Sequence, residues 1–170
     1  MHYSDHLIIL RWLLLLVVLP GLAGCGFHPR GQEMTPPPQL SPVSVSGLAN
    51  HHPFYRELTH QLEVSGVKLT TDEQAASTLL KIHSQKTDRR VLSVNARNNT
   101  VEYEIVESLQ YSIQRPPDAA GGEPLFLSTH RILFNPGIQI LGRDREENLL
   151  REDMYKQLAR LLINQLAAVR

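Results

Sequence analysis

The sequence has little cysteine: among its 170 residues only Cys25 carries a thiol. A single cysteine excludes an intrachain disulfide and any metal site built from several thiolates. The chain is long enough for one domain, which its apolar core alone must hold together.

An excess of charge of either sign is also absent, because 17 Lys and Arg residues balance 17 Asp and Glu residues. A balanced chain has no bulk attraction for a polyanion, so nucleic acid is not expected as a partner. Any binding driven by charge must therefore come from a local patch.

Long apolar runs are absent apart from one near the N-terminus. The run over residues 12–19 is shorter than the roughly 20 residues that span a bilayer. It leads into Leu22-Ala23-Gly24-Cys25, which resembles the lipobox of bacterial lipoprotein signals. We therefore predict that residues 1–24 are a lipoprotein signal peptide and that Cys25 becomes the first residue, acylated with chains such as palmitate. The alternatives are a soluble signal peptide with a chance cysteine, or a core helix.

Residues 25–39 contain Pro29, Gly31 and a run of three prolines at 36–38. Because proline fixes φ and lacks an N–H, this stretch predicts an extended, acylated tether and not a helix. The folded domain is then expected over residues 40–170.

The domain begins with a predicted strand over residues 40–46, where Val43 and Val45 alternate with serines. Pro42 limits this strand to an edge or restricts it to a strand start. A second short extended piece is expected over residues 67–70.

A helix of about 13 residues is predicted between these pieces. Pro53 suits its first position, with His52 or Asn50 as the cap and Gly66 just past its end. Its apolar positions recur at helical spacing: Phe54, Leu58, Leu62 and Val64.

Three long strands are predicted next, over residues 77–90, 101–114 and 125–134. Residues 91–94 could extend the first strand to a turn at 95–99, which is rich in asparagine. In the second strand, six of seven odd positions are apolar or aromatic and six of seven even positions are polar, so one face is buried. In the third, one face carries Phe126, Ile132 and Phe134, and the other carries Leu127, Arg131 and Leu133.

After an irregular stretch at 138–142, a helix of about 25 residues is predicted from Asp144, with Glu147 as its capping-box partner. Its apolar stripe comprises Leu150, Met154, Leu158, Leu161, Leu162 and Leu166. The element order β-α-β-β-β-α indicates an α+β two-layer sandwich, in which two helices pack on one face of a mostly antiparallel four-stranded sheet.

Catalytic motifs are missing: the chain has no nucleophile elbow, zincin motif or glycine-rich phosphate loop. His51 and His52 are neighbours whose side chains diverge, which favours a solvated helix start over a metal pair. Glu102 and Glu104 share a strand face about 7 Å apart, which suits paired carboxylates but also a solvated face. We therefore expect no enzyme, no metal and no cofactor; a periplasmic hydrolase is the alternative that these residues leave open.

One basic segment breaks the overall balance. Between residues 81 and 97 a single acid, Asp88, accompanies five basic residues: Lys81, Lys86, Arg89, Arg90 and Arg97. Arg131 could join them across the neighbouring strand. Clustered arginines bind phosphate through paired hydrogen bonds, so a phosphorylated lipid is a candidate ligand. The alternative is a solvated hairpin whose charges only discourage edge pairing.

The mature start Cys25-Gly26-Phe27-His28-Pro29-Arg30-Gly31 resembles that of the lipopolysaccharide-assembly lipoprotein family LptE. So do the element order, the segment from Ala96 to Tyr103 and the Phe134-Asn135-Pro136 sequence before the long charged helix. The resemblance implies a lipid-anchored protein of the outer membrane, facing the periplasm, that plugs the lumen of the LptD barrel and assists its assembly. Gly26 resembles the outer-membrane sorting pattern.

The resemblance also implies contact with lipopolysaccharide through basic residues of the sheet. Arg97 matches that pattern best and Arg131 matches it less well, whereas Lys86, Arg89 and Arg90 follow only from the charge cluster. The same features are also consistent with a second hypothesis, another envelope lipoprotein. Examples are a cell-wall synthase activator and a transporter's auxiliary lipoprotein.

Overall fold

The structure, a computed structural model, describes residues 36–116, 122–134 and 140–168, and side chains from residue 144 onward in the last range. The predicted signal peptide, Cys25 and the tether up to residue 35 lie outside the described residues, as do positions 138 and 139 of the expected irregular stretch. The predictions for these residues therefore stay predictions.

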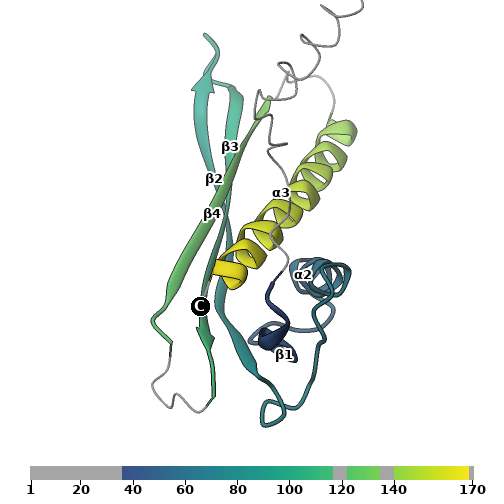
Figure 1. The fold of residues 1–170 in the computed structure, drawn as a ribbon. Helices are drawn as coiled ribbons and strands as arrows, with labels where there is room; N and C mark the ends of the chain where they lie inside the picture. The colour runs from purple at the N-terminus through teal and green to yellow at the C-terminus, as the bar shows by residue number, and fades with distance from the viewer. Residues whose placement is uncertain (1–35, 117–121, 135–139, 169–170) are drawn as a thin grey trace, which may run out of the picture. The chain divides into compact units, whose positions relative to one another are not determined.

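The described strands form one four-stranded sheet in the order β1-β2-β3-β4 (Figure 1). Its strands are β1 (Val43–Ser46), β2 (Thr78–Val94), β3 (Thr100–Gln114) and β4 (Leu125–Phe134). β1 runs parallel to β2, whereas β2, β3 and β4 form an antiparallel meander. The predicted α+β class and element order are confirmed, and the place of the first strand, which the sequence leaves open, is the edge beside β2.

β1 is short and both of its edges are occupied. On one side it pairs with β2, and on the other Val43 forms an isolated parallel bridge with Leu69. The Val43 N–H donates to the carbonyl of Lys68 at 2.8 Å, and the Thr70 N–H donates to the carbonyl of Val43 at 3.0 Å. The extended piece predicted over 67–70 is thus confirmed as a cover for this edge.

A turn of 3-10 helix, Pro38–Leu40, precedes β1. It begins within the stretch expected to be extended, because the fixed φ of proline suits a helical first turn as well as an extended chain. Leu40 is only 1% exposed. Leu40, the first residue of the predicted folded domain, is therefore buried within it.

Helix α2 (Pro53–Val64) begins as predicted, with His52 as its cap. The Phe54 N–H donates to Nδ1 of His52 at 3.2 Å, and Gly66 follows the helix at a φ of 81°. Phe54, Leu58 and Leu62 are fully buried. Val64, counted with them in the sequence, is 71% exposed because it lies on the solvent side of the last turn.

Helix α3 (Ile140–Ala168) has 29 residues, which corresponds to about 43 Å. It begins four residues before Asp144, so the capping-box prediction is wrong and Asp144 lies inside the helix. A single glycine such as Gly142 costs only about 1 kcal/mol in a helix and does not stop it. Of the predicted stripe, Leu150 and Leu161 are half-buried and the buried members are Met154, Leu158, Leu162 and Leu166.

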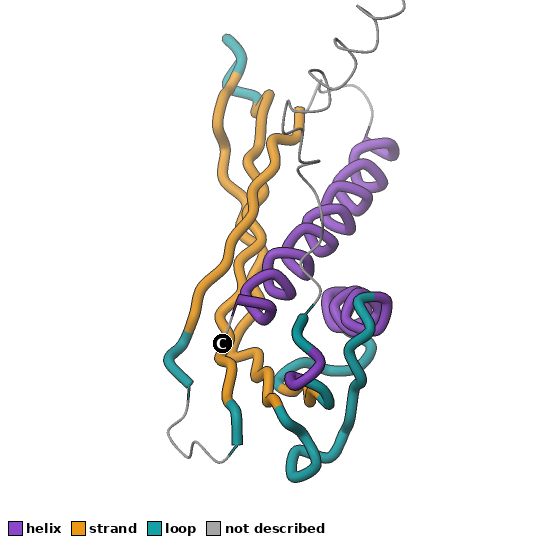
Figure 2. Tube along the Cα trace, in the orientation of Figure 1, coloured by secondary structure: helices purple, strands orange, loops and turns teal. Residues whose placement is uncertain are grey.

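Both helices lie on the same side of the sheet (Figure 2). One large core cluster joins them to it through α2 residues Phe54, Leu58 and Leu62, strand residues Leu80, Ile82, Leu109 and Tyr111, and α3 residues Leu158, Leu162 and Leu166. A smaller cluster of Ile105, Leu133 and Met154, with Leu150 against it, lies separately. The predicted two-layer arrangement is confirmed. No described helix covers the outer face of the sheet.

The β2–β3 hairpin contains an irregularity that decides where its side chains point. The pairing shifts between Ile82 and Ser84, so one extra residue, His83, stands opposite no partner in β3. Such a bulge changes which residues face the core. Before it the even residues Leu80 and Ile82 are buried, and after it Gln85 pairs with the buried Leu109. Odd residues therefore face the helices from Gln85 to Val91, after which the pairing shifts again.

Candidate functional site

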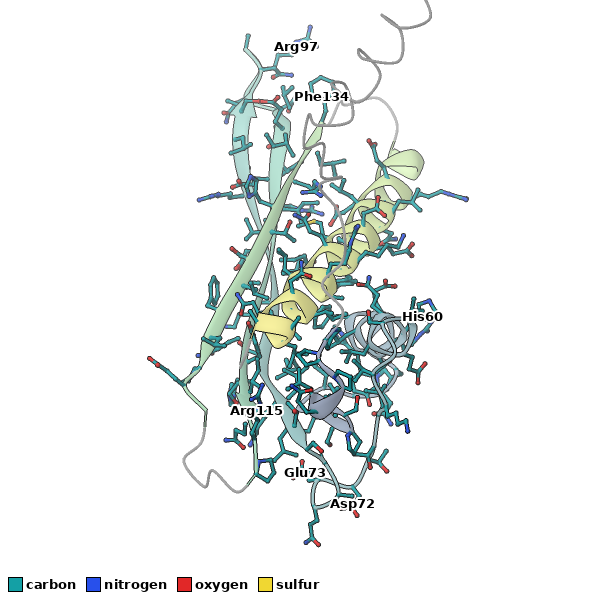
Figure 3. All side chains as sticks on the ribbon, in the orientation of Figure 1. His60, Asp72, Glu73, Arg97, Arg115 and Phe134 are labelled. Atoms are coloured by element: carbon teal, nitrogen blue, oxygen red, sulfur yellow. The ribbon has the colours of Figure 1, made fainter. Side chains whose placement is uncertain are left out.

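Arg97 lies at the tip of the β2–β3 hairpin, in the turn predicted from its asparagines (Figure 3). The side chain of Asn95 accepts hydrogen bonds from the backbone N–H groups of Arg97 and Asn99, at 2.9 and 3.0 Å. Asn98 adopts the left-handed conformation, with φ at 59°. The side chain of Arg97 is exposed and has no acidic partner among the described residues. This turn therefore holds an unneutralised guanidinium away from the helices.

Lys86 and Arg90 are on the outer face of the sheet, which the helices do not cover. They pair across the strands with Ser108 and Glu104, whose side chains lie on the same face. Arg90 forms an ion pair with Glu104. Lys86 is exposed and has no acidic partner in the described part of the chain. Of these two cations, only Lys86 is left without a countercharge.

Arg89 and Arg131 face the helices instead. Arg89 forms an ion pair with Glu147 of α3, and its guanidinium carbon lies 5.2 Å from the centre of the Tyr103 ring. Arg131 donates to the side-chain oxygen of Gln157 at 2.6 Å. Both side chains therefore join α3 to the sheet.

The five predicted lipopolysaccharide contacts thus do not form one patch. The structure places Arg97 at the tip, Lys86 and Arg90 on the outer face, and Arg89 and Arg131 on the helix face. It brings Arg89 and Arg131 into one cross-strand row, because each is opposite Ile105 of β3. The cations that remain available to an anion are Arg97 and Lys86.

A polar network centred on Glu107 of β3 was not predicted from the sequence. This carboxylate is completely buried. It accepts a hydrogen bond from the side-chain amide of Gln85. The Thr87 hydroxyl lies 2.9 and 3.0 Å from its two oxygens and donates to them. Nε of Arg151 in α3 donates to it at 3.0 Å, and a second nitrogen of Arg151 donates to the hydroxyl of Tyr155 at 2.9 Å.

Burial raises the pKa of Glu107, because a low-dielectric surrounding disfavours the charged form. The hydrogen bonds from Thr87 and Arg151 act in the opposite direction and offset part of that rise. A buried carboxylate persists in proteins when it is paired and hydrogen-bonded, as this one is.

The network continues across the sheet as a polar belt, which we define as Gln85, Thr87, Glu107, Thr129 and Gln157. Thr87, Glu107 and Thr129 are direct cross-strand neighbours, and the Thr129 hydroxyl donates to Gln157 at 2.9 Å. The Thr87–Glu107–Thr129 row of the belt lies between the row of Leu109, which belongs to the large core cluster, and the row of Ile105, which belongs to the smaller one. The signal available in the sequence was one charged residue in the apolar row of β3.

Of the carboxylates and histidines considered for chemistry, Glu102, Glu104 and His52 have structural partners, and His51 is exposed. Glu102 accepts a hydrogen bond from Ser93 at 2.7 Å, Glu104 pairs with Arg90, and His52 caps α2. Among the described residues, no cluster of three or more His, Cys, Asp or Glu side chains could hold a metal ion. The described helices also include none that is both long and apolar enough to cross a bilayer.

Comparison with known proteins gives a family match over residues 40–166, to the model described as "LptE: Lipopolysaccharide-assembly". The LPS-assembly lipoprotein LptE of Pectobacterium atrosepticum is 29% identical over 148 residues, covering 86% of this chain and 79% of the relative. The protein of the same name from Photorhabdus laumondii is 28% identical over 161 residues, covering 95% of this chain and 86% of the relative.

Solved structures share the fold. The solution structure of a lipoprotein B from Nitrosomonas europaea has a TM-score of 0.67 at 22% identity, covering 84% of this chain and 91% of that one. The crystal structure of the rare lipoprotein B from Shewanella oneidensis has a TM-score of 0.66 at 21% identity, covering 74% and 93%. These likenesses concern the fold alone, whereas the family match covers most of the domain. The chain therefore belongs to the LptE family of lipopolysaccharide-assembly lipoproteins.

Proposed function

We propose that this lipoprotein acts in the transport of lipopolysaccharide to the outer leaflet, as a plug and assembly partner of the LptD barrel in the outer membrane. It is acylated at Cys25 and faces the periplasm and the barrel lumen. The observation that carries the proposal is the LptE family match over residues 40–166. The fold is a two-layer sandwich with balanced charge, and its polar residues have structural roles. These properties suit a protein that acts by binding to a partner protein.

The proposal includes contact with lipopolysaccharide through the basic hairpin. Arg97 and Lys86 are its leading residues, because their side chains are exposed and without acidic partners among the described residues. A guanidinium binds phosphate through paired hydrogen bonds, and an ammonium acts as a point charge. Arg90, Arg89 and Arg131 would first have to give up Glu104, Glu147 and Gln157 respectively.

The partner is tested by capturing the full-length tagged protein from outer membrane solubilised in mild detergent. Co-purification of a large outer-membrane barrel is the expected result. A lipoprotein that is extracted alone would contradict the proposal, and one that captures cell-wall synthases or an inner-membrane transporter would favour the alternative envelope role. We expect a Cys25→Ala variant to carry no acyl chains and to leave the membrane fraction on cell fractionation.

The lipopolysaccharide contact is tested separately with Arg97→Asp. Reversing an exposed charge at a turn should leave folding unchanged and weaken lipopolysaccharide binding by at least about tenfold, since a hydrogen bond to a charged group contributes about 1.5–3 kcal/mol. Arg56→Asp on the exposed side of α2 is the matched control. Equal binding by both variants would remove Arg97 from the site without affecting the barrel partner.

A further inference from the structure

β4 is an open edge of the sheet. Among the described strands it pairs only with β3, so one side of its ten-residue backbone is left without a ladder. Its sequence contains no proline, lysine, aspartate or glutamate. These residue types are common means by which proteins block an edge strand, and the one charged residue of β4, Arg131, is directed to the helix side and bonded to Gln157. β4 therefore retains the ability to pair with another extended segment.

The outer face of this edge carries three large apolar side chains, with Ser128 and His130 between the first and the other two. Phe126, Ile132 and Phe134 are 67%, 58% and 56% exposed. Their partners in β3 are Gln110, Glu104 and Glu102, which are polar, so this apolar surface is confined to the edge strand. An added strand would cover these side chains with its own residues on that face.

The helix side of the same edge is different in character. A hollow of about 570 Å³ opens there between β4 and α3, lined by Arg131, Asp153, Gln157, Arg160 and Leu161. Asp153 pairs with Lys156 at 3.1 Å. Neither Arg131 nor Arg160 has a carboxylate partner among the described residues. Every second residue of an added strand would point toward this hollow.

We propose that β4 accepts an extended segment of another protein as a fifth strand, and that this segment alternates apolar with acidic residues. Its apolar residues would lie against Phe126 and Ile132. Its carboxylates would reach Arg160 and, in exchange for the hydrogen bond to Gln157, Arg131. A second copy of β4 does not fit this description, because it carries no acid and would bring another Arg131 toward the hollow. The proposal follows from the edge itself and does not depend on the lipopolysaccharide function.

The test uses the full-length protein in detergent and fluorescent strand-length peptides in which valine alternates with glutamate. Comparison peptides alternate valine with lysine, or contain valine and glutamate in shuffled order. We expect binding of the alternating valine–glutamate peptide alone, measured by fluorescence anisotropy, with slower hydrogen exchange at the amides of β4. Absence of binding, or equal binding of the shuffled peptide, would overturn the proposal.

Two pairs of variants locate the site. Ile132→Lys should weaken the binding of the valine–glutamate peptide by about tenfold, because lysine blocks edge strands. Leu92→Lys, at an exposed apolar residue away from β4, should leave this binding unchanged. Arg160→Glu should reverse the preference toward the valine–lysine peptide, with Arg56→Glu as its control. Equal effects within either pair would contradict the site. Sedimentation could also show a dimer that Ile132→Lys dissociates. That result would mean that a second copy of the chain occupies the edge, and it would overturn the proposal of an acidic segment from another protein.

Discussion

The buried carboxylate of Glu107 accepts a hydrogen bond from Arg151 at 3.0 Å, and this pair joins the middle of the sheet to the middle of α3. Arg151 also donates to the hydroxyls of Thr87 and Tyr155 at 3.0 and 2.9 Å. A single buried acceptor can be reached from only one position of the helix along the strands. The pair therefore adds a polar constraint on the register of the helix to that of the apolar packing.

Replacing Arg151 by methionine should destabilise the protein by about 3 kcal/mol, because it leaves Glu107 buried without its cation. We take the lower end of the usual range since the Arg151 side chain is itself 33% exposed. Chemical denaturation at neutral pH measures the change. The double variant Glu107→Leu with Arg151→Met should recover most of the loss. If the double variant is no more stable than Arg151→Met, the loss does not come from the unpaired buried charge of Glu107 alone.

Stability should also depend on His52. Burial lowers the pKa of His52 from 6.5, and the nearby His51 and Arg151 add to this. A histidine whose pKa is lower in the folded state contributes stability above its unfolded pKa, and this is lost as the pH falls from about 6.5 through the lower folded value. Protonation also removes the acceptor that caps α2.

His52→Asn keeps a good capping residue and removes the titration. We expect nearly equal unfolding free energies for the variant and the wild type at pH 7.5, and a growing advantage of the variant toward pH 5. Comparing the two proteins cancels other titrations, including that of Glu107. His60→Asn, at an exposed histidine of the same helix, should show no such advantage (Figure 3). Parallel pH curves for wild type and His52→Asn would refute the role of the cap.

Two glycines with positive φ should respond differently to alanine. At Gly47, φ is 95° and a Cβ would lie 1.9 Å from the backbone oxygen of Ile82. At Gly66, φ is 81° and a Cβ would meet nothing within 4 Å. We expect Gly66→Ala to cost about 1–2 kcal/mol, which is the left-handed penalty alone, and Gly47→Ala to cost more than about 3 kcal/mol. Thermal unfolding compares them, and equal losses would mean that β1 moves away from β2 at little cost.

The sequence predicts the sheet well where periodicity decides. Alternation in β3 gives the buried face that contains Leu109 and Tyr111, and helical spacing gives the buried face of α2. The family resemblance is confirmed, and with it the prediction that the chain is not an enzyme. These features depend on local patterns that one segment carries by itself.

The arrangement of the basic residues could not be predicted in the same way. One bulge residue, His83, changes the face of the residues from Ser84 to Val91, so Arg89 faces the helices while Lys86 and Arg90 face outward. Bulges arise from the pairing of two strands and leave no reliable mark in either. Similarly, Glu107 interrupts the alternation of β3, but its significance depends on Arg151, which lies 44 positions away.

The unequal edges of the sheet limit how many molecules can associate through it. On the β1 side, the backbone groups of Val43 already bond to residues 68 and 70, whereas β4 pairs only with β3 among the described strands. A sheet with one acceptor edge is monovalent, and an antiparallel pair of such sheets is closed. Growth into a filament requires two acceptor edges on each molecule. Association through the β4 edge alone therefore terminates at a fixed stoichiometry, whatever the protein concentration.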